Sequence, residues 1–230
     1  MATFRTFLKS IGYSYKRLRF LPLKEPNKVL YEQKRKTIQN CERFAKLRKI
    51  DLYFFDESGF STSSNIPYAW SPIKQTKVIK SFFAKRFNVL GFLSKQGDLK
   101  SFIKEETVTS DTVIEVFDEF SKSMTKPTTV VLDNASFHKS KKFKANISRW
   151  ANMGLTLLYL PPYSPQLNPI EILWKFIKYY WIEMSAYGSY TAMKQYVTKM
   201  LREYGVERVI DFKMQEEKNV PLLALSKTCY

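Results

Sequence analysis

Cysteines and long apolar runs are scarce in this sequence of 230 residues. Cys41 and Cys229 stand far apart and no CxxC pair occurs, which argues against a structural zinc site and suits a reducing compartment. No apolar run reaches the ~18 residues that a membrane span requires, and the N-terminus lacks the apolar core of a signal peptide. We therefore expect a soluble, intracellular chain with no membrane partner, large enough to bury one sizeable core.

Acidic residues are also scarce, because 38 Lys and Arg face only 21 Asp and Glu and give a net charge of +17. This excess favours a polyanionic partner. Residues 1–50 hold 14 Lys and Arg against 3 Glu, so the N-terminal fifth is a basic arm. Lys16, Arg17 and Arg19 form a cluster in it, just after Gly12. Either the arm contacts DNA, or it is a solvated helical segment with one buried stripe.

Apolar residues recur at helical spacing twice within the arm. The first series begins at Phe4 and is broken at Gly12. The second predicts a helix from about Pro26 to Leu47, with a stripe that includes Val29, Ile38, Cys41 and Phe44.

Short apolar runs of strand length follow from residue 50 onward. The expected strands are 50–55, 88–93, 99–103, 128–132 and 155–160, and the expected helices are 110–124, 139–152, one starting near Asn168, and 191–204. The second and third strands are joined by a turn-rich loop and are expected to form a hairpin. The order β-β-β-α-β-α-β-α predicts an α/β fold in which helices flank a mixed five-stranded sheet.

Three acidic residues stand where strands end. Asp56 follows the first expected strand, Asp133 follows the fourth, and Glu171 lies on the first turn of the helix after the fifth. If the first and fourth strands are neighbours, the three carboxylates meet at one edge of the sheet. They would repel one another unless a divalent cation screened them. The pattern therefore predicts two Mg²⁺ or Mn²⁺ ions ~4 Å apart, which suit phosphoryl transfer.

The start of the Glu171 helix has two interpretations. Asn168 has the position of an N-cap and Pro169 the first helical position, so Glu171 either completes a capping box or faces a site. The apolar residues from Ile170 to Met184 predict one buried helix face. Glu57 is acidic too, but it is expected to point away from Asp56 and is left out of the triad.

Three segments carry a resemblance to a known family. FDESGF at 55–60, VVLDNASFH at 130–138 and LPPYSPQLNPIE at 160–171 look like the three catalytic blocks of the insertion-sequence 630 transposases, members of the Tc1/mariner superfamily of DDE transposases. The resemblance covers about residues 50–205 and implies an RNase H-like catalytic domain in which Asp56, Asp133 and Glu171 bind the metal ions. It divides the chain into a basic helical arm at 1–49, the catalytic domain at 50–205 and a C-terminal tail at 206–230.

The resemblance also implies an activity and its partners. These are metal-dependent cleavage of double-stranded DNA at terminal inverted repeats, and strand transfer into target DNA at a TA step. We expect a homodimer in the bacterial cytoplasm, associated with the nucleoid, and an upstream reading-frame product that supplies the helix-turn-helix part. A stand-alone RNase H-like nuclease and a non-catalytic, DNA-binding remnant or inhibitor are the alternatives.

Several further residues are candidates for contacts with DNA, and each also has a purely structural interpretation. The segment 134–160 contains no acid and carries a run of lysines, which either bind phosphates or form a solvated face. Asn134 either orients Asp133 or a metal-bound water, or satisfies a turn. The candidates are His138, the one histidine of the chain, together with Lys139, Lys141, Lys142, Lys16, Arg17, Arg19 and Tyr163.

Overall fold

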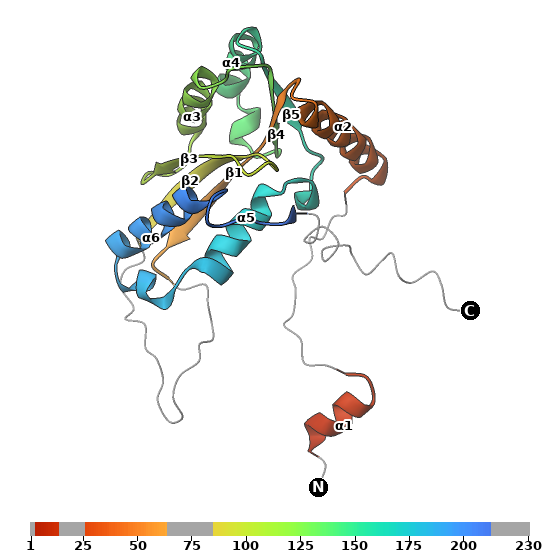
Figure 1. The fold of residues 1–230 in the computed structure, drawn as a ribbon, viewed down its shortest axis with the longest axis vertical. Helices are drawn as coiled ribbons and strands as arrows, with labels where there is room; N and C mark the ends of the chain where they lie inside the picture. The colour runs from red at the N-terminus through yellow and green to blue at the C-terminus, as the bar shows by residue number, and fades with distance from the viewer. Residues whose placement is uncertain (1–2, 14–25, 64–84, 213–230) are drawn as a thin grey trace, which may run out of the picture.

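The computed structural model describes residues 3–13, 26–63 and 85–212. A five-stranded sheet with the order β3-β2-β1-β4-β5 forms its centre (Figure 1). The strands are β1 (Asp51–Ser61), β2 (Arg86–Leu93), β3 (Leu99–Lys104), β4 (Thr128–Leu132) and β5 (Leu155–Tyr159). Pairing is antiparallel among β1, β2 and β3 and parallel among β1, β4 and β5. The predicted mixed sheet and its strand order along the chain are confirmed.

Helices cover both faces of this sheet, with α3 and α4 on one side and α5 and α6 on the other (Figure 1). The α-helices are α1 (Phe4–Ser10), α2 (Lys28–Lys46), α3 (Ser110–Lys122), α4 (Lys141–Asn152), α5 (Ile170–Phe176) and α6 (Tyr190–Glu203). Shorter turns are the 3-10 helices η1 (Phe137–Lys139), η2 (Pro165–Leu167) and η4 (Met184–Gly188) and the π-helix η3 (Ile177–Trp181). The helix expected at 139–152 is thus split into η1 and α4, because Ser140 caps α4 by accepting from the N–H of Phe143.

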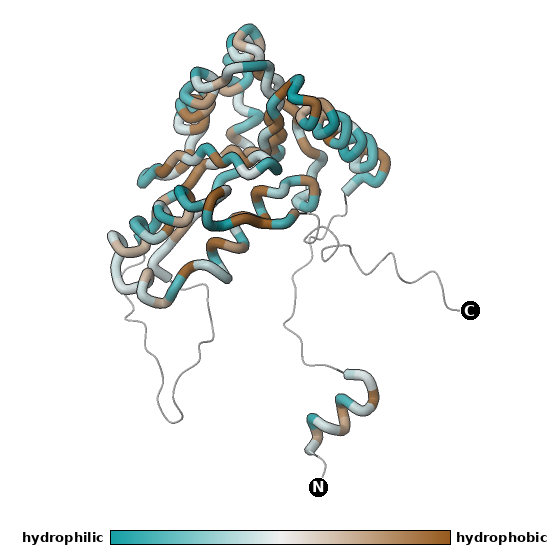
Figure 2. The backbone as a smooth tube through the Cα atoms, viewed as in Figure 1, coloured by the Kyte–Doolittle hydropathy of each residue, from teal (hydrophilic) through white to brown (hydrophobic). Residues whose placement is uncertain are grey.

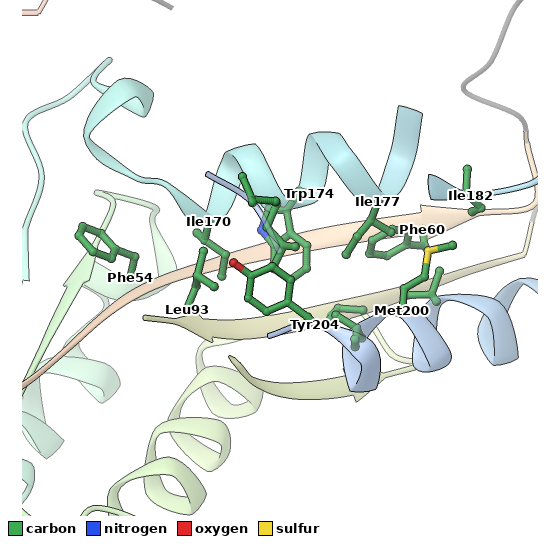
Figure 3. Packing of buried hydrophobic residues seen from close by; sticks show 14 of the residues in the cluster. Phe54, Phe60, Leu93, Ile170, Trp174, Ile177, Ile182, Met200 and Tyr204 are labelled. Atoms are coloured by element: carbon green, nitrogen blue, oxygen red, sulfur yellow. The ribbon is translucent and has the colours of Figure 1, made fainter. Parts of the chain in front are cut away.

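Each face of the sheet has its own apolar core. Successive residues of a strand point to opposite faces, so Phe54 packs toward α5 and α6 whereas Phe55 packs toward α3 and α4. Figure 3 shows the first core, in which Ile170 and Trp174 lie between α5 and the sheet and Phe54 lies further along β1. The second core is rich in aromatic rings, and Phe117 contacts both Phe55 and other rings of this layer. Two filled layers hold the central strands β1 and β4 rigidly in place.

The apolar stripe of α2 is only partly buried. Ile38 is 5% exposed and Cys41 packs against the same core, but Val29, Phe44 and Leu47 remain exposed. Figure 2 shows α2 as mainly hydrophilic, and the helix meets the sheet over a short stretch of β1. The helix is thus a mostly solvated one whose apolar stripe is buried only around Ile38 and Cys41.

The buried face of the Glu171 helix ends earlier than predicted. Ile170, Trp174 and Ile177 are buried as expected, but Tyr180 is 65% exposed. The α-helical ladder changes to the π-helix η3 at Ile177, which places more residues in a turn and rotates the following side chains. Regular helical spacing therefore stops predicting burial at this point.

The described beginning of the C-terminal tail packs on the domain expected at 50–205. Ile210 and Phe212 are 5% and 6% exposed and belong to the core under α5 and α6. Because α2 packs on that core too, the core contains residues from both the predicted N-terminal arm and the predicted C-terminal tail. No helix in the described ranges is long and apolar enough to cross a membrane.

Candidate active site

Asp56 lies within β1, which corrects the prediction that the first strand ends before it. The parallel pairing of β1 with β4 stops at Phe54 and Val131, but the other edge of β1 stays paired with β2, where Asp56 lies opposite Gly91. Because β2 continues to provide backbone partners, the Asp-Glu-Ser-Gly segment stays extended. By the alternation of side chains, Asp56 shares the face of Phe54 and points toward the α5 layer.

Asp133 follows the last residue of β4, as predicted, and it is held there by its neighbours. Its carboxylate Oδ1 accepts a hydrogen bond from the backbone N–H of Ala135 at 2.9 Å. The amide of Asn134 donates to the carbonyl of Leu160, so Asn134 joins the ends of β4 and β5 instead of orienting Asp133. Burial opposes ionisation, but the bonds to His138 and Ala135 outweigh it and lower the pKa of Asp133.

His138 connects Asp133 to Glu57. Its Nδ1 lies 2.9 Å from Oδ1 of Asp133 and its Nε2 lies 3.0 Å from Oε1 of Glu57, and the ring is 0% exposed. Burial disfavours the charged ring, but hydrogen bonds to both carboxylates prevail and raise the pKa of His138 to about 9. The expectation that His138 touches a DNA phosphate does not fit this burial, because both nitrogens are already bonded to protein carboxylates.

Asn168 does not cap α5 with its side chain. Its Nδ2 donates to the carbonyl of Phe55, 3.1 Å away in β1, while the N–H of Glu171 bonds to the backbone oxygen of Asn168 at 3.1 Å. Pro169 takes the N-cap position without a side-chain bond, so the capping-box interpretation of Glu171 is wrong. Asn168 thereby ties the start of α5 to the central strand and fixes Glu171 beside Asp56.

The three carboxylates interact through their charges. Burial, followed by the charges of Glu57, Glu171 and Asp133, raises the pKa of Asp56 well above its usual range. Burial and the charge of Asp133 raise the pKa of Glu171 to about 7. Within the described ranges no three acidic, His or Cys side chains are grouped closely enough to hold an ion. The set nevertheless fits a divalent cation, because all three side chains offer the hard oxygen donors that such ions prefer.

Sequence reasoning missed two cations on this side of the sheet, Lys178 close to Asp56 and Arg86 close to Lys178. Lys178 lies close enough to Asp56 for their charges to interact, and its Nζ is 5.3 Å from the ring centroid of Phe60. Burial lowers the pKa of Lys178 and the charge of Asp56 opposes that change. Arg86 of β2 interacts with Lys178 and packs over Gly59. Lys178 stands seven residues after Glu171, a spacing of two helical turns that was available in the sequence.

The remaining candidates for DNA contacts lie on the surface. Lys139 and Lys141 are exposed, and the charge of Lys139 acts on Asp133. Lys142 is exposed too, but it pairs with Asp111 at 2.9 Å. Tyr163 is 49% exposed and has a φ of 59° in the loop before α5. The predicted contacts Lys16, Arg17 and Arg19 lie outside the described residues.

Solved structures with this fold include those of the Mos1 mariner transposase, whose catalytic domain is RNase H-like as predicted here. Its strand transfer complex matches with a TM-score of 0.55 and 15% identity over 97% of this chain and 69% of that chain. The paired-end complex with Mg matches with a TM-score of 0.58 and 15% identity over 97% of this chain and 69% of that chain. The paired-end complex with Mn matches with a TM-score of 0.57 and 14% identity over 91% of this chain and 64% of that chain.

Sequence comparisons give a family. The uncharacterized protein y4pE/y4sA of Sinorhizobium fredii is 34% identical over 61 residues, which are 26% of this chain and 41% of that protein. The match thus spans less than half the length of that curated relative. The family described as DDE superfamily endonuclease matches residues 51–194, which hold β1 through the start of α6 and all three carboxylates. On this match, which covers more than half of the chain, the protein belongs to the DDE superfamily endonucleases.

Proposed function

We propose that this chain is the catalytic chain of a DNA transposase, which cuts DNA at the ends of a mobile element and joins the freed 3′ ends to target DNA at a TA step. One observation carries the proposal: Asp56, Asp133 and Glu171 interact at one edge of the sheet of a DDE endonuclease domain. The net charge of +17 supports a polyanionic substrate.

The proposed metal ligands are Asp56, Asp133 and Glu171, which would hold two Mg²⁺ or Mn²⁺ ions. When bound, such ions activate a water or hydroxyl and stabilise the leaving oxygen of a phosphodiester. The protein itself contributes the placement of the carboxylates: β1 carries Asp56, the end of β4 carries Asp133 and the first turn of α5 carries Glu171. Burial first, and the neighbouring negative charges second, raise the pKa values of Asp56 and Glu171, and a bound cation would favour the ionised form of both.

Basic side chains around the carboxylates are the proposed contacts with the DNA backbone. Lys139 and Lys141 are exposed at η1 and at the start of α4, and Lys178 lies beside Asp56 on the other face of the sheet. An ammonium group there binds a phosphate oxygen and releases a counterion. Tyr163, exposed in the loop before Glu171, offers its ring for stacking on an unpaired base.

The proposed assembly is a homodimer on paired DNA ends, together with an upstream reading-frame product that reads the terminal inverted repeats. The similar Mos1 structures include paired-end complexes, which supports such an arrangement in this fold. The proposed location is the nucleoid of a bacterial cytoplasm, where such a substrate is found.

The experiment is cleavage and strand transfer on a labelled duplex that carries the terminal repeat, with Mg²⁺ or Mn²⁺, with and without the upstream product. Wild type is compared with Asp133→Asn and with the matched control Asp51→Asn. Asp51 begins β1, at the other end of the pairing with β4, and forms an ion pair with Lys126 at 3.0 Å. We expect cut and joined products from wild type and from the control, and neither product from Asp133→Asn.

Two outcomes contradict the proposal. Hydrolysis without joined products, even with the upstream product present, identifies a stand-alone nuclease. DNA binding without any metal-dependent cleavage identifies a non-catalytic remnant or an inhibitor.

A further inference from the structure

A chain of three side chains runs from the buried Glu57 and His138 to Asp133, whose side chain is 50% exposed. The two ring nitrogens lie 3.0 Å from Glu57 Oε1 and 2.9 Å from Asp133 Oδ1. Carboxylate oxygens accept hydrogen bonds and do not donate them, so both nitrogens act as donors in this arrangement. Glu57 is 14% exposed and the ring is 0% exposed, so the bond between them is shielded from water, whereas the far side of Asp133 is open to solvent.

The ring of His138 is fixed in orientation by its surroundings. The rings of Phe55, Phe137 and Phe143 lie 5.5, 4.6 and 5.7 Å from it between centroids. The hydroxyl of Tyr159 donates to the backbone carbonyl of His138 at 3.0 Å. Rotation of the imidazole would break two bonds to carboxylates inside a packed aromatic layer, so the ring holds a single orientation.

This fixed ring determines which oxygen of Asp133 remains available. Oδ1 receives two hydrogen bonds, one from the ring Nδ1 and one from the N–H of Ala135, both at 2.9 Å. Neither donor bonds to Oδ2. Oδ1 is therefore committed to the protein, while Oδ2 receives neither of these bonds and is left for a ligand.

We propose that Glu57 and His138 are positioning residues that present Asp133 to a divalent cation as a ligand with a single free oxygen. The inference rests on the proposed function, because it assumes that Asp133 binds metal. Glu57 orients the ring from the side opposite Asp133, and the ring orients the carboxylate. Partners of this kind around a ligand typically change metal affinity by about 10–100-fold when they are removed.

A merely structural role for Glu57 makes a different prediction. In that case the bond to His138 only satisfies a buried ring, and its loss lowers stability without changing metal affinity in the folded protein. In the positioning role, the loss of Glu57 frees the ring and then the carboxylate, so the affinity for the ion falls even where the fold is intact.

The test measures Mn²⁺ binding to the full chain by the electron paramagnetic resonance signal of free Mn²⁺. Wild type is compared with Glu57→Ala, with Glu57→Gln, which keeps an acceptor oxygen, and with Glu115→Gln as the matched control. Glu115 is 68% exposed on α3 and pairs with Lys104 at 3.1 Å. Far-UV circular dichroism verifies that each variant is folded.

We expect Glu57→Ala to weaken Mn²⁺ binding about 10–100-fold, Glu57→Gln to restore most of the affinity, and Glu115→Gln to match wild type. The Mn²⁺ concentration that half-saturates DNA cleavage should rise with the dissociation constant in Glu57→Ala, while KM for DNA stays unchanged. If Glu57→Ala does not fold, the comparison passes to Glu57→Asp, whose shorter side chain withdraws the carboxylate from the ring and should weaken binding in the same direction.

A change below about threefold in the folded variant overturns the inference. The proposed function is tested separately by Asp133→Asn. If Asp133→Asn still cleaves DNA, the proposed function fails. If it loses cleavage while Glu57→Ala binds Mn²⁺ like wild type, only the positioning role fails.

Discussion

Raising the pH from 5 to 9 in the absence of metal should destabilise this fold, because the site holds protons that the unfolded chain releases. Glu171 has a pKa of about 7 in the folded protein, against an ordinary value of 4.5. Between these values the folded chain keeps a proton that the unfolded chain has lost, so the free energy of unfolding falls as the pH rises. Asp56, whose pKa is also raised, acts in the same direction.

His138 extends the effect to higher pH. Its folded pKa of about 9 exceeds the ordinary value of 6.5, so the stability it contributes is complete below 6.5 and is lost as the pH rises through 9. One pKa unit corresponds to about 1.4 kcal/mol, which gives the fully buried ring a contribution of about 3 kcal/mol. Part of Glu171 is open to solvent although its carboxylate is partly desolvated, so screening reduces its share to about 1 kcal/mol.

The assay is urea unfolding in EDTA at pH 5 to 9, followed by tryptophan fluorescence and circular dichroism. Glu171→Gln should flatten the profile between pH 5 and 7, and His138→Gln should flatten it between pH 7 and 9. Glu115→Gln, exposed on α3, should keep the wild-type slope. A wild-type profile that is flat or rises from pH 5 to 7, or a Glu171→Gln profile with the same slope as wild type, refutes the reasoning.

Three further changes probe the supports of the site. Gly91→Val should cost about 1–3 kcal/mol in urea unfolding and reduce cleavage, because a Cβ there would meet the ring of Trp174 at 2.9 Å. Asn168→Ala should cost about 1–3 kcal/mol by the same measurement, since it leaves a β1 carbonyl without its donor. Lys141→Gln should reduce the slope of log binding constant against log salt concentration by about one counterion. Lys142→Gln should reduce that slope less, because Lys142 is already paired with Asp111. Equal slopes for the two variants would contradict this difference.

The strands could be predicted where their signals are local. Thr128–Leu132 has the bounds expected from its apolar run, because Pro127 precedes it and Asp133 follows it. The end of β1 could not be predicted in this way. The residues after Phe55 resemble a turn, yet they stay extended because β2, more than 30 residues further along the chain, pairs with them. A partner distant in sequence outweighed the local preference.

In the candidate site too, features with a local sequence signal could be predicted, and features that depend on a distant partner could not. The three blocks identified Asp56, Asp133 and Glu171, and the structure brings their charges together. The role of Asn168 was misjudged, since its side chain bonds to a carbonyl 113 residues away and not to its own helix. Local capping rules describe what a residue can do for its own helix, and they carry no information on a backbone carbonyl that folding brings beside it.

The position of Glu57 links these observations. Alternation along β1 predicts that Glu57 points away from Asp56, and it does so: it shares the face of Phe55 and meets His138 in the α3 and α4 layer. Asp56 shares the face of Phe54 and interacts with Glu171 in the α5 layer. Asp133, at the end of the neighbouring parallel strand, is reached from both layers.

Two consecutive acidic residues on one strand therefore have opposite relations to the site. Asp56 adds negative charge to the cluster on one face, while Glu57 on the other face is offset by the ring that holds Asp133. An exchange of the two faces, by a one-residue shift of β1 against β2, would place Glu57 in the α5 layer and remove the support from Asp133. The long antiparallel pairing of β1 with β2, from Phe54 to Ser61, prevents that shift. The length of β1 beyond its pairing with β4 therefore matters for the candidate site, because it fixes which carboxylate faces Glu171 and which one faces the histidine.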